Sequence, residues 1–236
     1  MKIVTLLEKL YYRTDPDRYL NYLRKKGCRI GEGTHIFCSP RCLCLDSTRP
    51  ELLEIGNDVQ ITRDVRIITH GYDWAVLKGK YGDILGSAGK VKIGNNVFIG
   101  MNATILKGTV VGNNCIIGAS SLVNGCFPDD VVIAGNPAKV ICTIEEYYHK
   151  RIAAQLHEAR ELVKAHFACY HKIPEKEVLN EFFWLWEERK QIENEVFFQK
   201  MHLVRNFDKS MERFLSTKPV FPSYEAFIQD CLENQD

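Results

Sequence analysis

A period of six residues dominates the middle of the chain. Aliphatic side chains recur without a gap at every sixth position (Ile93, Ile99, Ile105, Val111, Ile117, Val123). Glycine directly follows several of them, and a small or β-branched residue recurs four positions after most. Neither the 3.6-residue period of a helix nor the two-residue alternation of a strand produces this spacing. A six-residue period is typical of a parallel β-helix, in which three hexapeptides form one triangular coil of about eighteen residues.

The repeat also extends toward the N-terminus, with one long interruption. The same spacing holds from Ile55 to Ile67 and, more faintly, from Ile30 to Ile36. Residues 68–92 then interrupt it with a segment rich in glycine and aromatic residues. A long insert in a regular solenoid is usually a functional loop on one face, so we expect the site there.

Helices are predicted on both sides of the repeat. Residues 2–13 are mostly apolar and charged, and Asp15-Pro16 supplies an N-cap and a first-turn proline for a second helix that ends at Gly27. After the repeat, the pattern predicts a long amphipathic helix, a second helix, a stretch of helix or irregular structure and a last short helix (145–172, 175–190, 191–215, 224–234). We expect the aromatic cluster 182–186 to pack within this region or against a neighbouring subunit.

Composition and charge exclude several classes of protein. The 31 Lys and Arg residues balance 30 Asp and Glu residues, which argues against a nucleic-acid-binding protein. No run of about 18 apolar residues predicts a transmembrane helix, and the N-terminus lacks the features of a signal peptide. Nine cysteines without an export signal predict reduced thiols and a cytoplasmic location.

Two motifs carry a family resemblance. The repeat ends in Gly-Asn-Pro-Ala-Lys-Val-Ile at residues 135–141, and Thr-His-Gly-Tyr-Asp-Trp stands at residues 69–74. With the unbroken hexapeptides, the first closely resembles the hexapeptide-repeat acyltransferases, above all the galactoside and maltose O-acetyltransferases and the related polysaccharide O-acetyltransferases. The second, with the long helical tail, is most similar to enzymes that acetylate bacterial surface polysaccharides.

The resemblance implies the fold class. It predicts a mainly β chain with a left-handed parallel β-helix over residues 28–142, although parallel crossovers are ordinarily right-handed. Residues 1–27 are expected to form an N-terminal helical cap, and residues 143–236 a C-terminal α-helical extension.

His70 is the candidate catalytic residue. A sugar hydroxyl is a poor nucleophile, and a neutral imidazole can take its proton as the oxygen attacks a thioester. By itself the spacing leaves His70 open as an ordinary polar loop residue. The resemblance implies that it is the general base for direct acetyl transfer from acetyl-CoA to a sugar hydroxyl, with no covalent enzyme intermediate.

Three residues after His70 are candidates for substrate binding. Asp73 could orient the imidazole or bind a sugar hydroxyl, and a simple role in the turn is equally open. Tyr72 or Trp74 could stack on a sugar ring, because an aromatic face offers a large apolar surface at small entropic cost.

The resemblance also implies an acetyl-CoA groove along the coils at a subunit boundary. Carried over position by position, the expected contacts lie late in the repeat (Gly100, Met101, Ala119, Asn124, Gly125, Lys139, Cys142). Lys139 is the charged group placed for a phosphate, and a solvated turn lysine is the other interpretation. Gly125 stands where relatives commonly have lysine, and residues 30–55 lack the asparagine that galactoside-type enzymes place near the thioester.

The remaining expectations concern assembly, acceptor and metal content. The resemblance implies a homotrimer and a carbohydrate acceptor, with peripheral association with a polysaccharide assembly machinery left open. No metal is expected, because the cysteines of residues 38–44 near His35 lack the second ligand pair of a zinc site. The acceptor stays open between a surface polysaccharide or its precursor, a free oligosaccharide and an amino sugar acetylated on nitrogen. A non-catalytic hexapeptide-repeat scaffold or binding subunit is the alternative from another class.

Overall fold

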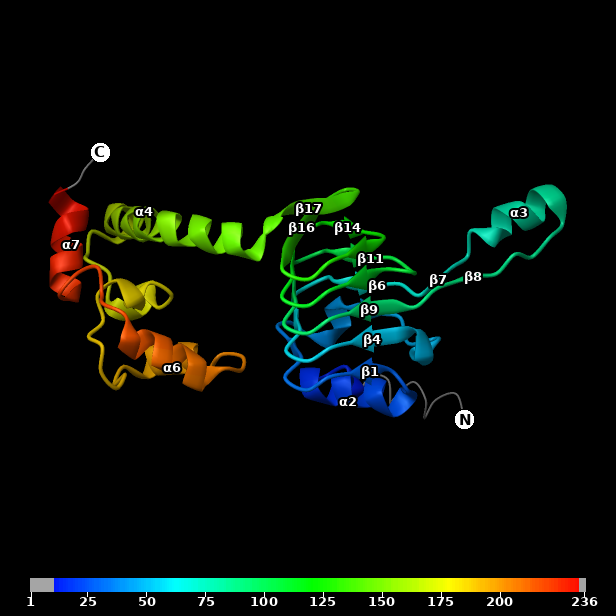
Figure 1. Cartoon of the computed structure of the whole chain (residues 1–236), viewed down its shortest axis with the longest axis horizontal. Helices are drawn as coiled ribbons and strands as arrows, with labels where there is room; N and C mark the ends of the chain where they lie inside the picture. The colour runs from blue at the N-terminus through cyan, green and yellow to red at the C-terminus, as the bar shows by residue number, and fades with distance from the viewer. Residues whose placement is uncertain (1–10, 234–236) are drawn as a thin grey trace. The chain divides into compact units, whose positions relative to one another are not determined.

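The computed structural model describes residues 11–233 of the 236-residue chain. Two compact units make up the chain, Met1–Tyr147 and Tyr148–Asp236 (Figure 1). Most of the helix predicted over residues 2–13 lies outside the described residues. Between residues 11 and 233, no helix is both long and apolar enough to cross a membrane.

The first unit is a β-helix with three sheets of parallel strands. The first sheet contains β1 (Arg29–Ile30), β4 (Leu53–Ile55), β9 (Val91–Ile93), β12 (Val110–Val111) and β15 (Cys126–Phe127). The second contains β2 (His35–Ile36), β5 (Gln60–Ile61), β10 (Phe98–Ile99), β13 (Ile116–Ile117) and β16 (Val131–Gly135), with β17 (Ala138–Thr143) antiparallel at its end. The third contains β3 (Cys44–Leu45), β6 (Arg66–Ile67), β11 (Thr104–Ile105) and β14 (Leu122–Val123).

Strand register confirms that three hexapeptides form one coil. Ile99 pairs with Ile117 and Ile105 pairs with Val123, in each case eighteen residues along the chain (117 − 99 = 18). The six repeat aliphatics of residues 93–123 are all at most 1% exposed. The prediction that they point inward and stack coil on coil is therefore confirmed.

Asparagine side chains stack at the corner between the first and second sheets. The Asn57 N–H donates to Oδ1 of Asn95 at 2.8 Å, and the Asn95 N–H donates to Oδ1 of Asn113 at 2.9 Å. The next residue in two of these turns, Asn96 and Asn114, has a φ of 54°. Asparagine tolerates this left-handed conformation. The side-chain amide of the preceding asparagine, Asn95 or Asn113, accepts the turn N–H of the preceding coil, so that this N–H is satisfied.

A helix covers the first coil of the β-helix. α2 (Pro16–Lys26) begins at Asp15, whose side chain accepts from the Arg18 N–H, and it ends at Gly27, which has a φ of 107°. Leu20 and Leu23 of this helix are buried in the β-helix core. Both helix-end predictions are confirmed.

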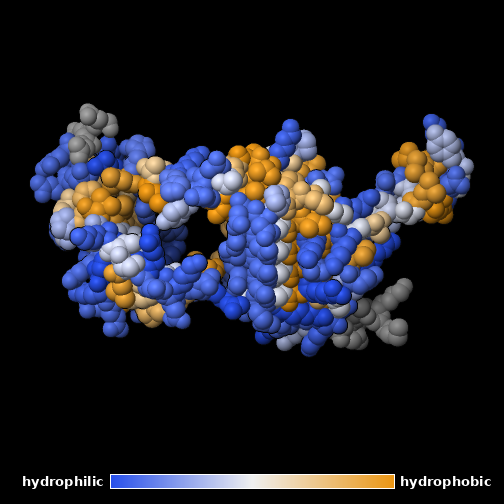
Figure 2. All heavy atoms as spheres, in the orientation of Figure 1, coloured by the Kyte–Doolittle hydropathy of each residue, from blue (hydrophilic) through white to orange (hydrophobic). Residues whose placement is uncertain are grey.

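The long insert leaves the coil between β6 and β9 as an arm, here defined as residues 70–88. Its two edges, β7 (His70–Gly71) and β8 (Ser87–Ala88), pair antiparallel, and between them lies α3 (Trp74–Tyr81). No residue of α3 is buried, and Val76 is 75% exposed. Figure 2 shows apolar side chains gathered at the tip of the arm.

The second unit consists of helices, so the term mainly β describes only the first unit. Its elements are α4 (Ile144–Tyr170, which starts in the first unit), the 3-10 turns η3 (Lys176–Leu179) and η4 (Phe183–Leu185), and then α5 (Glu195–His202), α6 (Phe207–Ser216) and α7 (Tyr224–Glu233). The predicted long helix and the predicted last helix are confirmed.

Residues 175–190 do not form the single helix that the sequence predicts. Two 3-10 turns occupy the segment instead. Five consecutive apolar residues would surround an α-helix, so part of the cluster would remain in water. The turns bury Phe183, Leu185 and Trp186 together in the core of this unit, which confirms the predicted packing of the aromatic cluster.

Candidate active site

His70 is the first residue of the arm, and its backbone is fixed by the coil behind it. The Ile68 N–H donates to the Ile105 carbonyl at 2.9 Å, and the Gly89 N–H donates to the Thr69 carbonyl at 2.9 Å. Thr69 is fully buried, whereas the His70 side chain is 16% exposed. The imidazole thus stands at the boundary between a rigid coil and solvent.

Asp46 is the direct partner of His70. Its Oδ2 lies 2.6 Å from His70 Nδ1 and also accepts from the Thr69 hydroxyl at 2.6 Å and the Thr69 N–H at 3.1 Å. Its Oδ1 accepts from the Thr48 hydroxyl at 2.7 Å and the Thr48 N–H at 3.1 Å. Five donors therefore converge on one carboxylate that is only 9% exposed.

The hydrogen bonds keep the Asp46 carboxylate ionised. Burial by itself would raise the pKa of Asp46, but the hydrogen bonds from Thr69 and Thr48 outweigh it and hold that pKa well below its usual range. An ionised carboxylate only accepts hydrogen bonds, so Nδ1 of neutral His70 carries the proton. Nε2 then has a free lone pair, which is the form that a general base requires.

Asp46 is the residue of the candidate site that sequence reasoning missed. We considered Asp73 as the residue that could orient the imidazole, but Asp73 is exposed at the start of α3 and Asp46 makes the contact. The sequence signal that could have identified Asp46 is its position directly after Leu45. Leu45 pairs with Ile67 in the next coil. The two are 22 residues apart (67 − 45 = 22), so the eighteen-residue period does not reveal the pairing.

The aromatic candidates lie beside the imidazole. The Tyr72 ring meets the His70 ring edge to face with centroids 5.3 Å apart, and the Trp74 ring lies 6.1 Å beyond Tyr72. Tyr72 is 71% exposed. An exposed aromatic surface therefore extends from His70 along the arm.

The expected acetyl-CoA contacts are divided among three places. Gly100, Met101 and Ala119 lie together at the corner between the second and third sheets, where the Ser120 N–H donates to the Met101 carbonyl at 2.8 Å. Asn124 and Gly125 lie between the third and first sheets, at the corner from which the arm leaves.

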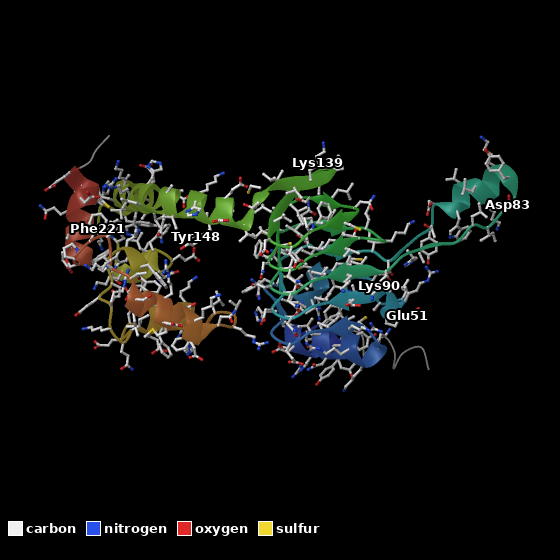
Figure 3. All side chains as sticks on the ribbon, viewed as in Figure 1. Glu51, Asp83, Lys90, Lys139, Tyr148 and Phe221 are labelled. Carbon is white, nitrogen blue, oxygen red and sulfur yellow. The ribbon has the colours of Figure 1, made fainter. Side chains whose placement is uncertain are left out.

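The remaining two expected contacts lie on the last strand. Lys139 pairs with Ala134, and Cys142 with Val132, in the hairpin of β16 and β17. Lys139 is exposed at the end of the coils (Figure 3). In one chain, therefore, only Asn124 and Gly125 share a corner with His70.

The cysteines of the first coil do not form a ligand set. Cys38, Cys42 and Cys44 are free thiols, and within the described part of the chain no three His, Cys, Asp or Glu side chains gather closely enough to hold a metal ion.

Comparison with known proteins assigns the repeat to a family. Residues 90–125 match the family described as bacterial transferase hexapeptide (six repeats). Protein CapG of Staphylococcus aureus is 41% identical over 128 residues, which cover 54% of this chain and 73% of CapG. The chain belongs to the hexapeptide-repeat transferase family. The resemblance inferred from the repeat and from residues 135–141 is confirmed.

Two proteins from Escherichia coli (strain K12) are also similar to this chain, with lower identity than CapG. The putative lipopolysaccharide biosynthesis O-acetyl transferase WbbJ is 35% identical over 111 residues, covering 42% of this chain and 53% of WbbJ. Galactoside O-acetyltransferase is 31% identical over 140 residues, covering 58% of this chain and 64% of that enzyme. The chain therefore spans about half to two thirds of these two relatives.

Proposed function

We propose that this hexapeptide-repeat transferase moves an acetyl group from acetyl-CoA to a hydroxyl group of a carbohydrate, with His70 as the general base. The observation that supports this most strongly is the 2.6 Å contact between His70 Nδ1 and Asp46, which leaves Nε2 free to accept a proton. The names of WbbJ and galactoside O-acetyltransferase support a sugar acceptor and an acetyl donor.

The proposed reaction needs one base and one oxyanion donor. Nε2 of His70 takes the proton from the acceptor hydroxyl as its oxygen attacks the thioester carbonyl. The tetrahedral intermediate then collapses, the carbon–sulfur bond breaks, and the CoA sulfur receives the proton from His70. Asp46 holds the imidazole and stabilises the imidazolium between these steps.

The two parts of this machinery lie at different corners of one chain. The Met101 N–H, our candidate for the oxyanion donor, meets no acceptor among the described residues and lies across the third sheet from the corner of His70. A thioester held by both groups would therefore need the Met101 corner of a neighbouring copy. This supports a homotrimer with its sites between left-handed coils, as expected from the family.

The substrate residues and the compartment complete the proposal. Tyr72 and Trp74 would offer stacking surfaces for a sugar ring, and Asp73 is exposed beside them. All nine cysteines are free, which supports a reducing compartment such as the cytoplasm, where acetyl-CoA is available.

The test is acetyl-CoA-dependent release of CoA thiol across a panel of sugars and nucleotide sugars. His70→Ala should lower turnover by roughly 10²–10⁴-fold, whereas His157→Ala, an exposed histidine on α4, should leave it unchanged. Full activity in His70→Ala would refute the mechanism. No binding of acetyl-CoA by calorimetry would favour the scaffold alternative, and binding without release would mean that the acceptor was missing from the panel.

A further inference from the structure

An arginine without a partner lies on the loop that carries Asp46. This loop, residues 46–52, joins β3 to β4, and Thr48 on it approaches His70 Nδ1 to 3.4 Å. Arg49 follows directly, and its Nη1 is buried with no hydrogen-bond partner. No carboxylate of residues 11–233 lies within ion-pair distance of Arg49, although the residue as a whole is only partly buried.

Of the three acidic residues nearest Arg49 in the sequence, Asp46 and Glu54 are already engaged, and Glu51 is exposed and forms no ion pair with it among the described residues. Asp46 accepts its five hydrogen bonds from Thr69, Thr48 and His70. Glu54, at the end of the same connection, pairs with three basic side chains (Arg29, Lys90, Lys92). A guanidinium stays charged at any physiological pH, and enclosing one of its donors without an acceptor is costly. The loop that carries Asp46 and Thr48 therefore also carries a cation that forms no ion pair with the described side chains.

The order of the coils indicates which substrate meets this cation. Arg49 belongs to the first coil and His70 to the second, whereas the expected acetyl-CoA contacts belong to later coils and to the terminal hairpin. Figure 3 shows Lys139 at that end of the coils, and Glu51, two residues from Arg49, nearer the other end. In the order of the coils, His70 therefore lies between Arg49 and the expected donor contacts, which favours the acceptor as the partner of Arg49.

We propose that Arg49 binds an anionic group of the acceptor, a carboxylate or a phosphate, so that this transferase acts on an acidic or phosphorylated saccharide. The inference rests on the proposed function. The planar guanidinium matches both anions with paired N–H donors, and its position one residue from Thr48 would set the distance between the anion and the hydroxyl that His70 deprotonates. Arg49 is in this view a specificity-determining residue.

The test measures sugar binding by the full chain, with matched neutral and anionic probes. Galactose is compared with galacturonic acid, which adds a carboxylate, and with galactose 1-phosphate, by saturation-transfer NMR at millimolar concentrations. Acetyl-CoA is titrated separately by calorimetry. Wild type should bind at least one anionic probe about tenfold more tightly than galactose, a difference of about 1.4 kcal/mol. Whichever anionic probe binds names the group.

Three variants separate the explanations. Arg49→Gln should abolish the preference for the anionic probe without weakening acetyl-CoA binding, and Arg49→Lys should keep part of it. Arg29→Gln, an exposed arginine on the first sheet, should change neither. If Arg49→Gln unfolds early in a thermal melt, the comparison of Arg49→Lys with wild type decides the matter.

Several results would overturn the inference. The first is that wild type shows no preference for an anionic probe. The second is that the preference survives in Arg49→Gln. The third is that Arg49→Gln loses as much affinity for acetyl-CoA as for the sugar, which would assign Arg49 to the phosphates of CoA. Failure of the proposed function looks different, because acetyl-CoA would then not bind or turnover would not depend on His70.

Discussion

Asp46→Asn is the most informative change to the candidate site. It keeps the shape of the side chain and replaces one carboxylate oxygen with an NH₂ group. The new amide has two possible orientations. In the first, its oxygen faces His70 and its NH₂ group faces the two donors of Thr48, which then lack an acceptor. In the second, its NH₂ group faces the Thr69 N–H, which then lacks an acceptor. In the second orientation it also donates to His70 Nδ1, and the imidazole proton moves to Nε2, where no lone pair remains for the substrate.

The expected loss can be estimated from these contacts. A hydrogen bond to a charged group contributes about 1.5–3 kcal/mol, and it would stabilise the imidazolium that forms in the transition state. At about 1.4 kcal/mol for each factor of ten, this interaction accounts for roughly 10–10²-fold in turnover. The fraction of His70 in the wrong tautomer adds to this, so we expect a fall in kcat of about 10²–10³-fold with the KM for acetyl-CoA nearly unchanged.

The assay is CoA release with a sugar that the wild type acetylates, together with urea unfolding at several pH values. Because the folded pKa of Asp46 is lowered, its carboxylate contributes stability that is present above the unfolded pKa of about 4 and is lost as the pH falls through the folded value. Wild type and Asp46→Asn should therefore differ in stability at pH 7 and converge in strong acid. A kcat within threefold of wild type would refute the argument that Asp46 fixes the tautomer.

Two further predictions concern the fold. A Cβ on Gly94 would lie 2.5 Å from the Gly112 carbonyl oxygen in the next coil, so Gly94→Ala should destabilise the chain by about 1–3 kcal/mol in urea unfolding. Gly79→Ala on α3 meets nothing within 4 Å and should cost no stability, and equal effects of the two changes would contradict the close coil spacing. Burial raises the pKa of both Cys28 and Cys231 to about 11, so iodoacetamide at pH 8 should modify the exposed thiols first (Cys44, Cys126, Cys169). The stability that the two buried thiols contribute is present below about pH 9 and should be lost as the pH rises toward 11, which alkaline unfolding would measure.

The periodic part of the fold was predictable because one physical requirement repeats. Each coil must bury one aliphatic residue per strand and turn tightly at each corner. The inward positions of Ile99 and Ile117 can therefore be predicted from the spacing alone, without knowing which residues pack against them. The helix ends at Asp15 and Gly27 were also predictable from the local sequence, because each cap satisfies backbone groups of its own helix. The segment 175–190 was not predictable in this way, because its turns are selected by the packing of aromatic rings from other helices.

The candidate site shows the same division between local and distant information. His70 could be singled out as a candidate because it opens the insert and because the family resemblance implies a base at that position. Asp46 could not, because the first coil is longer than eighteen residues and its register against β6 is set by the loops at its corners. Arg49 carries no pattern at all, and only the burial of its Nη1 without an acceptor distinguishes it from a surface arginine.

The two longest departures from the period occur at one corner of the β-helix, which is the corner of the candidate site. The connection from the third sheet to the first is the loop 46–52 in one coil and the arm 70–88 in the next, whereas the following coils make it with the short segments 106–109 and 124–125. Regular turns need only glycine, asparagine and small residues, so they leave no room for a base, a carboxylate and a cation in one place. Two consecutive irregular connections stack directly on each other and bring Asp46, Arg49 and His70 into adjacent layers. A solenoid of this kind can therefore vary its acceptor through these two connections while the coils that are expected to hold the donor keep their repeat.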